Sequence, residues 1–149
     1  MLSNKTKYGL KAMLHLAEME GQGGQFVAEI AQQQKIPKKF LDAILLELKN
    51  GNLLFSKKGK AGGYTLAKSS KDIYLGNIIR ILEGPLALLP CASASAYRPC
   101  EDCTDTRACQ IRLVIQKVRD ATADILDHTS LNDLVAKRIP MESYLFYDI

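Results

Sequence analysis

Long hydrophobic runs are missing from this sequence of 149 residues. The longest uncharged stretch, residues 84–97, is shorter than the roughly 20 apolar residues that a helix needs to cross a bilayer. Charged side chains from Lys5 to Glu20 interrupt the apolar residues near the amino terminus, so the continuous apolar core of a signal peptide is absent. We therefore expect a soluble, cytoplasmic protein with no membrane partner.

The sequence also lacks the residue groupings of an enzyme. Its two histidines, His15 and His128, fall in expected helices, where a histidine is more often a packing or surface residue than a catalyst. Cys100 and Cys103 form a Cys-x-x-Cys pair, but no strand–helix–strand pattern surrounds them as it does in thioredoxin-like oxidoreductases. We expect a protein that is not an enzyme and has no catalytic residues.

The chain does have apolar residues for a core, at 47%, and an uneven distribution of charge. Residues 1–80 hold thirteen Lys and Arg against six Asp and Glu, a net charge of +7. Residues 81–149 hold seven against ten, a net charge of −3. A basic first part joined to an acidic second part suggests that the first part meets a polyanion.

Three helices are predicted in the basic part. The first covers residues 3–20, the second residues 27–34, and Pro37 opens a third that Gly51 ends in the C′ position. The inner face of the third helix is expected to consist of Phe40, Leu41, Ile44, Leu45 and Leu48. Two helices separated by a short turn are typical of a helix-turn-helix, whose second helix enters the major groove of DNA.

A β-hairpin is predicted to follow in residues 52–68, "NLLFSKKGKAGGYTLAK". The residues available for packing are Leu53, Phe55, Tyr64 and Leu66. A helix-turn-helix followed by a basic hairpin is the sequence form of a winged helix. The predicted fold is therefore mainly α, with a winged helix-turn-helix domain that has a two-stranded β wing.

The second part begins with a helix over residues 75–84 and continues, after a cysteine-containing loop, with a long helix from about Asp105 to His128. The apolar stripe of this long helix is too broad for one small domain to cover. We therefore expect a twofold dimer in which the long helix is the dimerisation helix. Ser130 and Asp133 form a capping box for a last short helix, and an aromatic tail follows that we expect to dock on the dimer. We assign residues 1–80 to DNA binding and residues 81–149 to the cysteine loop and dimerisation.

DNA contact is predicted from the third helix and the wing. Lysines on both elements can neutralise phosphates, Lys38 and Lys39 can donate to guanine edges, and Asp42 can accept from cytosine. Glycines in the wing permit a tight turn and close backbone approach. The expected DNA-binding residues are Lys38, Lys39, Phe40, Asp42, Lys57, Lys58, Lys60, Gly62 and Gly63.

All four cysteines fall within residues 91–109, with the spacing C-x8-C-x2-C-x5-C. In a reducing cytoplasm such a group is read as metal ligands or redox thiols before structural disulfides, and soft thiolates favour iron-sulfur clusters or zinc. Cys103 and Cys109 flank the predicted start of the long helix, where the helix dipole, Arg107 and Arg112 would lower a thiol pKa and favour oxidation. A reversible disulfide, between Cys100 and Cys103 or another pair, is the alternative to a metal.

The segments "KYGLKAMLHLA", "EIAQQQKIPKKFLDAILLELKNGNL", "KKGKAGGYTLAK", "IYLGNIIRILEGP" and "TSLNDLV" cover most of the chain. They resemble successive parts of the IscR, NsrR and CymR type of bacterial transcription regulator, and the "GGY-x-L-A" wing before a cysteine loop is highly specific. The resemblance implies a homodimer with crossed long helices and a partly palindromic operator in double-stranded DNA. In several members it also implies an iron-sulfur cluster that changes DNA affinity or sequence preference.

The resemblance also implies ligand positions. Cluster-binding relatives place three cysteines at intervals of five residues in this loop and take a fourth ligand from elsewhere. Cys103 and Cys109 match the second interval, and Cys91 matches the first ligand if the loop is three residues longer, which makes Cys100 an extra thiol.

The fourth ligand departs from the pattern of the relatives. IscR-like members have a histidine where this chain has Arg112, and NsrR-like members have an acidic residue at or beside the position of Lys7. Arginine cannot ligate a metal and lysine is a poor ligand, so an all-cysteine set is the simplest complete shell for a 2Fe-2S cluster, a 4Fe-4S cluster or zinc. The expected metal ligands are Cys91, Cys100, Cys103 and Cys109.

We expect a DNA-binding transcription regulator, a repressor, whose operator binding is tuned by this cysteine loop. The first expectation is an iron-sulfur cluster that responds to redox state, oxygen, nitric oxide or iron-sulfur status. The alternative is a cluster-free regulator of the same fold that senses thiol oxidation, a partner protein or a small molecule.

Overall fold

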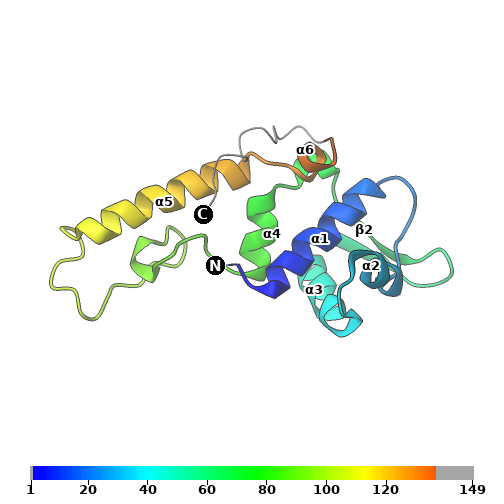
Figure 1. The fold of residues 1–149 in the computed structure, drawn as a ribbon, viewed down its shortest axis with the longest axis horizontal. Coiled ribbons are helices and arrows are strands. Elements are labelled where there is room, and N and C mark those ends of the chain that lie inside the picture. Colours follow the sequence, from blue (N-terminus) through cyan, green and yellow to red (C-terminus); the bar gives the residue numbers. More distant parts are fainter. Residues whose placement is uncertain (1, 137–149) are drawn as a thin grey trace.

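The computed structural model describes residues 2–136 and is mainly helical (Figure 1). Its elements are α1 (Asn4–Glu18), α2 (Val27–Gln34), α3 (Lys38–Asn50), β1 (Leu54–Lys57), β2 (Gly63–Leu66), the 3-10 turn η1 (Ser70–Asp72), α4 (Leu75–Leu82), the 3-10 turn η2 (Pro90–Ala92), α5 (Gln110–Asp127) and α6 (Leu131–Val135). Helices α1 to α3 and the hairpin gather at one end of the molecule, and α5 extends away from them (Figure 1). The predicted mainly α fold with a two-stranded wing is confirmed.

The turn between α2 and α3 creates the predicted helix-turn-helix. Lys35 ends α2 in the left-handed conformation, with φ of 53°, and Ile36 turns its side chain into the core, where it is 4% exposed. Pro37 is the N-cap of α3, so the helix begins at Lys38, one residue later than we predicted. The chain therefore reverses over three residues, which brings α3 against α2.

Helix α3 buries Leu41, Ile44, Leu45 and Leu48 as predicted, but Phe40 is 59% exposed. The prediction of an inward Phe40 is wrong, because the buried residues at spacings of three and four define one stripe and Phe40 lies beside it. The prediction that Gly51 takes the C′ position is wrong, because Gly51 is the C-cap of α3 with an ordinary φ of −79° and the left-handed residue is Asn52.

The wing is an antiparallel hairpin in which Leu54 pairs with Leu66 and Ser56 with Tyr64. Directly opposed residues share a face, so Leu54, Leu66 and Tyr64 face the core, and Phe55 points to solvent at 63% exposure. The prediction that Phe55 packs inward is wrong. The left-handed Asn52 explains the outward position of Phe55. Leu53 is buried in the turn after α3, and the alternation of inward and outward side chains starts only at Leu54.

One core joins α1, α2, α3, α4 and α6. Met13, Ile30, Leu45, Ile78 and Leu131 each have no exposed area, and they come from α1, α2, α3, α4 and α6 in that order. Burying each such side chain stabilises the fold by about 1.5–3 kcal/mol relative to leaving it exposed. Helix α6 therefore returns to the winged-helix part and completes its core.

The return of the chain is held by backbone hydrogen bonds next to α4. Leu131 N donates to Ile73 O at 2.9 Å, and Leu75 N donates to Thr129 O at 3.0 Å. Ser130 and Asp133 form the predicted capping box of α6.

The predicted boundary at residue 80 lies inside α4, and the division into two parts stays a prediction. The predicted docking of the aromatic tail, residues 141–149, lies outside the described residues.

Helix α5 begins at Gln110, so the prediction of a start near Asp105 is wrong. The Asp105 side chain accepts a hydrogen bond from Arg107 N at 2.8 Å and forms a local turn instead of a helix cap. No residue of α5 is buried, and the exposed fractions of Ile111, Val114 and Ile125 are 67%, 59% and 64%.

Within residues 2–136, no helix has the length and apolar character needed to span a membrane.

Candidate DNA-binding surface and cysteine loop

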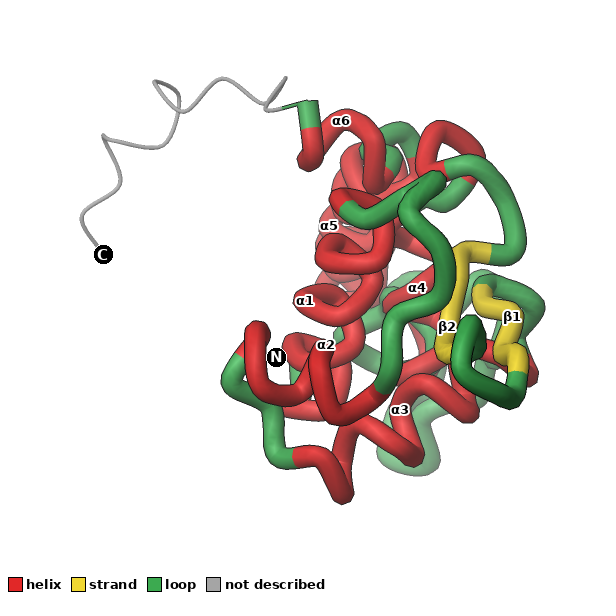
Figure 2. The backbone as a smooth tube through the Cα atoms, turned by 90° about the vertical axis from the view of Figure 1, so that its right-hand side faces the viewer, coloured by secondary structure: helices red, strands yellow, loops and turns green. Residues whose placement is uncertain are grey.

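The predicted basic residues lie on two neighbouring elements. Lys38 and Lys39 are exposed in the first turn of α3, and Lys57, Lys58 and Lys60 are exposed around the tip of the wing. Figure 2 shows α3 and the hairpin at the same end of the chain trace. Of these five lysines, only Lys38 forms an ion pair with another described residue. The structure therefore offers four of these ammonium groups to an external anion.

The ion pair of Lys38 is made with Asp42, one helical turn later, at 3.0 Å. Both side chains are at least half exposed, at 59% and 50%, so the pair contributes only about 0.2–1 kcal/mol. Burial, and then the charge of the nearby Asp42, raise the pKa of Tyr64 in the wing. Asp42 of α3 therefore lies near Tyr64 of the wing, and DNA contact by Lys38 or Asp42 competes with a weak ion pair.

The wing is pinned to the segment before α2 by Gln25. Gln25 N donates to Tyr64 O at 2.9 Å, and Tyr64 N donates to Gln25 O at 2.8 Å. Gly63 has φ of +107°, and a Cβ atom there would lie 2.6 Å from the backbone of Gln25, so this position requires glycine. Gly62 is buried. Both glycines allow other backbone segments of this chain to pass close by, Gln25 at Gly63 and Lys57 at Gly62. Their contact with DNA stays a prediction.

Three of the four cysteines come together in the loop between α4 and α5. Cys91 lies in η2 and is 3% exposed, whereas Cys100 and Cys103 are half-buried in the following loop. A hydrogen bond with Cys91, followed by desolvation and a hydrogen bond with Cys103, raises the pKa of Cys100 to about 12. All four cysteines are free thiols.

The ligand atoms of Cys100, Asp102 and Cys103 lie within 4.8 Å of one another, close enough to share one ion. Cys109 has a different place, because it is the N-cap of α5 and its Sγ accepts a hydrogen bond from Arg112 N at 3.4 Å. The donor set of adjacent thiols fits a thiolate-bound metal or cluster, and Asp102 is a donor that the sequence pattern did not indicate.

One expectation about thiol reactivity is wrong. Cys103 does not flank the start of the long helix, because α5 begins seven residues later at Gln110. Cys109 does lie at the helix start, where its Sγ accepts a hydrogen bond from the backbone amide of Arg112. The raised pKa of Cys100 keeps that thiol protonated, which makes it a poor nucleophile in the metal-free protein.

Arg112 occupies the position at which a histidine would have supplied a ligand, and it binds the loop through hydrogen bonds. Its Nε donates to the carbonyl of Cys91 at 2.8 Å and its Nη1 to that of Thr106 at 3.3 Å. Arg119 Nη1 donates to the carbonyl of Ala92. Sequence reasoning missed both roles, because an arginine in a helix carries no local signal of the carbonyl that it will meet.

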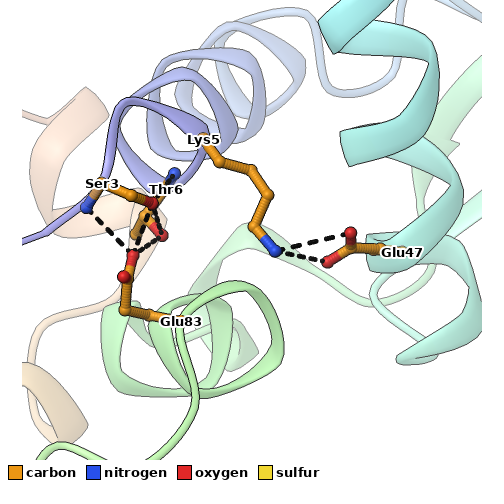
Figure 3. Close-up of polar contacts among 5 residues, drawn as sticks. All are labelled: Ser3, Lys5, Thr6, Glu47 and Glu83. Carbon is orange, nitrogen blue, oxygen red and sulfur yellow. Dashed lines mark hydrogen bonds and ion pairs between the residues drawn. The ribbon is translucent and has the colours of Figure 1, made fainter.

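A polar network joins the loop side of the molecule to α3, and it was also missed (Figure 3). The Glu83 carboxylate, just after α4, accepts hydrogen bonds from Ser3 and Thr6 at the start of α1. On the same turn of α1, Lys5 Nζ lies 3.1 Å from Glu47 Oε2 in α3. Helix α1 is thereby tied to both α4 and α3.

A helix-turn-helix, a basic wing and a projecting helix together define a winged-helix transcription regulator. Residues 2–137 match the Rrf2 family, described as an iron-dependent transcriptional regulator, and the chain belongs to this family. A protein of Rhodobacter capsulatus described as an rrf2-like HTH-type transcriptional regulator is 38% identical, over 97% of this chain and 99% of its own length.

Two solved structures share this fold over most of their own length and most of the length of this chain. CymR of Bacillus subtilis, described as its global cysteine regulator, superposes with a TM-score of 0.75 at 32% identity, covering 92% of this chain and 97% of CymR. IscR of T. potens superposes with a TM-score of 0.73 at 28% identity, covering 99% and 93%. The resemblance to the CymR and IscR type is confirmed, and the Rhodobacter capsulatus relative and CymR are both described as transcriptional regulators.

Proposed function

We propose that this chain is a cytoplasmic repressor that binds a partly palindromic operator in double-stranded DNA as a homodimer. The amino-terminal part of α3 reads bases in the major groove, and the wing lysines contact phosphates. The exposed lysines of α3 and the wing support this placement, because they have no described carboxylate partner apart from the Lys38–Asp42 pair. The exposed apolar stripe of α5 supports a dimer that presents two such readers.

The DNA surface is tested by replacing Lys39 and Lys58 together with alanine. We expect the variant to bind duplex DNA more weakly, with the slope of log affinity against log salt reduced by about 0.9 for each phosphate that is no longer neutralised. Fluorescence anisotropy at several salt concentrations measures both quantities. Lys117→Ala is the matched control, because Lys117 is exposed on α5 at the other end of the molecule. Unchanged affinity and slope in the double variant would contradict the assignment.

We further propose that the cysteine loop tunes operator binding. The observation that carries this proposal is the convergence of the thiols of Cys91, Cys100 and Cys103 in a family whose description names iron. These three cysteines would hold an iron-sulfur cluster, 2Fe-2S or 4Fe-4S, or zinc, with Cys109 or Asp102 completing the shell. A bound cluster would supply redox chemistry that responds to oxygen, nitric oxide or iron-sulfur status.

The cofactor is tested by anaerobic purification of the full chain, followed by an absorption spectrum and by analysis of iron, sulfide and zinc. We expect bound iron and sulfide with visible absorption, and loss of both in a Cys100→Ser/Cys103→Ser variant. A colourless, metal-free protein would contradict the cluster and the zinc together. Iron and sulfide that persist in the variant would contradict the ligand set.

The alternative is a cluster-free regulator that senses thiol oxidation, a partner protein or a small molecule. Its support is the contact of the Cys100 thiol with both Cys91 and Cys103, since adjacent free thiols can form a disulfide when an oxidant is present. Mass spectrometry after peroxide treatment distinguishes this case. A disulfide among these cysteines that changes DNA affinity, in protein that never contained metal, would favour the alternative.

A further inference from the structure

Two arginines of α5 hold the backbone that carries Cys91. Arg112 and Arg119 are seven residues apart, close to two helical turns, so their side chains leave α5 on the same face. They donate to consecutive carbonyl groups of η2, Arg112 to that of Cys91 and Arg119 to that of Ala92. Charged donors make such hydrogen bonds stronger than neutral ones, so η2 is fixed on α5.

Arg112 also reaches the later part of the loop. Its Nη1 donates to Thr106 O, and its guanidinium carbon lies 5.5 Å from the centroid of the Tyr97 ring. One side chain thereby joins α5 to three separate points of the cysteine loop. A planar guanidinium has several donors in fixed directions and can make these contacts at once, which a lysine ammonium cannot.

The two anchors determine where the Cys91 thiol lies. Cys91 is 3% exposed and is held from its carbonyl side, whereas Cys100 and Cys103 belong to an irregular loop with no helix or strand. The Cys91 thiol is the largest cause of the raised pKa of Cys100, so the two side chains lie close together. Of these three cysteines, Cys91 is therefore the one whose backbone is bound to α5, through the hydrogen bonds of Arg112 and Arg119 to η2.

We propose that Arg112 and Arg119 are positioning residues of the cysteine site, which hold Cys91 against Cys100 and carry a displacement of the loop into α5. This inference rests on the proposed function, in which the cysteine loop is the sensor. The opposite end of α5 is joined to α4 by the Arg80–Asp127 ion pair, so a shift of η2 on α5 has a continuous set of contacts to the winged-helix part.

The positioning of Cys91 is tested in a full-length protein that retains only this cysteine, made by Cys100→Ser, Cys103→Ser and Cys109→Ser. Its reaction rate with a coloured disulfide reagent reports how often Cys91 becomes accessible. We expect Arg112→Ala and Arg119→Ala each to raise this rate by about tenfold, because each removes a charged hydrogen bond to the backbone. Arg119→Lys should recover part of the protection, and Lys117→Ala, on the same helix, should leave the rate unchanged. Wild-type rates in both alanine variants would overturn the proposal.

The link to the metal site is tested by titrating the chain with all its cysteines, reduced and free of metal, with Co²⁺ and following the thiolate-to-cobalt absorption band. We expect Arg119→Ala to weaken cobalt binding by about tenfold, and Lys117→Ala to have no effect. Equal cobalt affinity in Arg119→Ala and the wild type overturns the positioning role. Failure of the wild type to bind cobalt contradicts the metal sensor instead, and the reaction rate of Cys91 then decides the role of the arginines alone.

Discussion

Glu83 is the residue through which the segment before the cysteine loop is tied to α1. Its Oε2 accepts hydrogen bonds from Ser3 N at 3.0 Å, from Ser3 Oγ at 2.7 Å and from Thr6 Oγ1. The hydrogen bond from Thr6, followed by those from Ser3, lowers the pKa of Glu83 to about 2. The ionised carboxylate is therefore preferred in the folded protein more strongly than in the unfolded chain.

This preference makes stability depend on pH through Glu83. Because the pKa falls from 4.5 to about 2 on folding, the contribution of Glu83 is present above pH 4.5 and is lost as the pH falls toward 2. We expect wild type to have a higher urea midpoint than Glu83→Gln at pH 7, and the difference to shrink between pH 4.5 and pH 2.

Thr6→Val provides the matched variant, since it keeps the shape of the buried side chain and removes the hydrogen bond that lowers the pKa of Glu83 most. In the Thr6→Val background, the difference in urea midpoint between the protein with Glu83 and its Glu83→Gln variant should depend less on pH. A difference that stays constant from pH 7 to pH 2 in the wild-type background would show that the hydrogen bonds do not stabilise the ionised carboxylate.

At the scale of elements, a bidentate ion pair joins α4 to α5. Arg80 Nη1 lies 2.5 Å from Asp127 Oδ1, and Nη2 lies 2.8 Å from Oδ2. The hydrogen bond from Arg80 holds the pKa of Asp127 below its ordinary value. A Cβ atom at Gly76 would clash with Asp127 Oδ1, so glycine leaves the space that this carboxylate occupies.

Two changes test the joint. A double-mutant cycle with Arg80→Ala and Asp127→Ala should give a coupling of about 0.5–1 kcal/mol in the free energy of unfolding, because both side chains are partly exposed. Gly76→Ala should lower the thermal midpoint, although alanine normally favours a helix over glycine. The exposed pair of Lys5 and Glu47 gives a second cycle for comparison. A coupling near zero together with a stabilised Gly76→Ala would contradict this description of the joint.

The elements themselves were largely predictable. Helix α2 covers the predicted residues, and α4 begins at the predicted Leu75, because local periodicity and end signals determine both helices. The errors arose where a local polar contact or a left-handed residue changed the chain path. Asp105 bonds Arg107 instead of opening α5, and the left-handed Asn52 sets the strand alternation that exposes Phe55.

The cysteine loop was predictable in composition but not in arrangement. The spacing of the cysteines indicated a common site, and the structure brings Cys91, Cys100 and Cys103 together. It does not place Cys109 with them, and Cys100 lies near both Cys91 and Cys103, while the ligand assignment stays a prediction. These positions depend on contacts of Arg112 and Arg119 with distant carbonyls, which are tertiary and leave no pattern in the sequence.

At the scale of the whole molecule, the exposed stripe of α5 predicts self-association. Val118 is 41% exposed and Ile125 is 64% exposed in the single chain, and burying such side chains favours a twofold interface. We expect sedimentation to give twice the chain mass for the wild type and for Lys117→Asp. Val118→Asp/Ile125→Asp should sediment as a monomer, because the interface would bury two uncompensated charges. A double variant that remains dimeric would place the interface elsewhere.

The central claim is that the state of the cysteine loop changes how the winged helices bind DNA. The most direct measurement is the affinity of anaerobically purified protein for a duplex that the same protein has selected from a random pool, before and after its cysteine site is stripped of metal or oxidised. We predict that the affinity of the wild type changes by about tenfold, within the usual range of coupling between two sites. We expect the Cys100→Ser/Cys103→Ser variant to fold and to bind DNA, and we predict that its affinity shows no change. Equal affinity of the wild type in all its states would contradict the account.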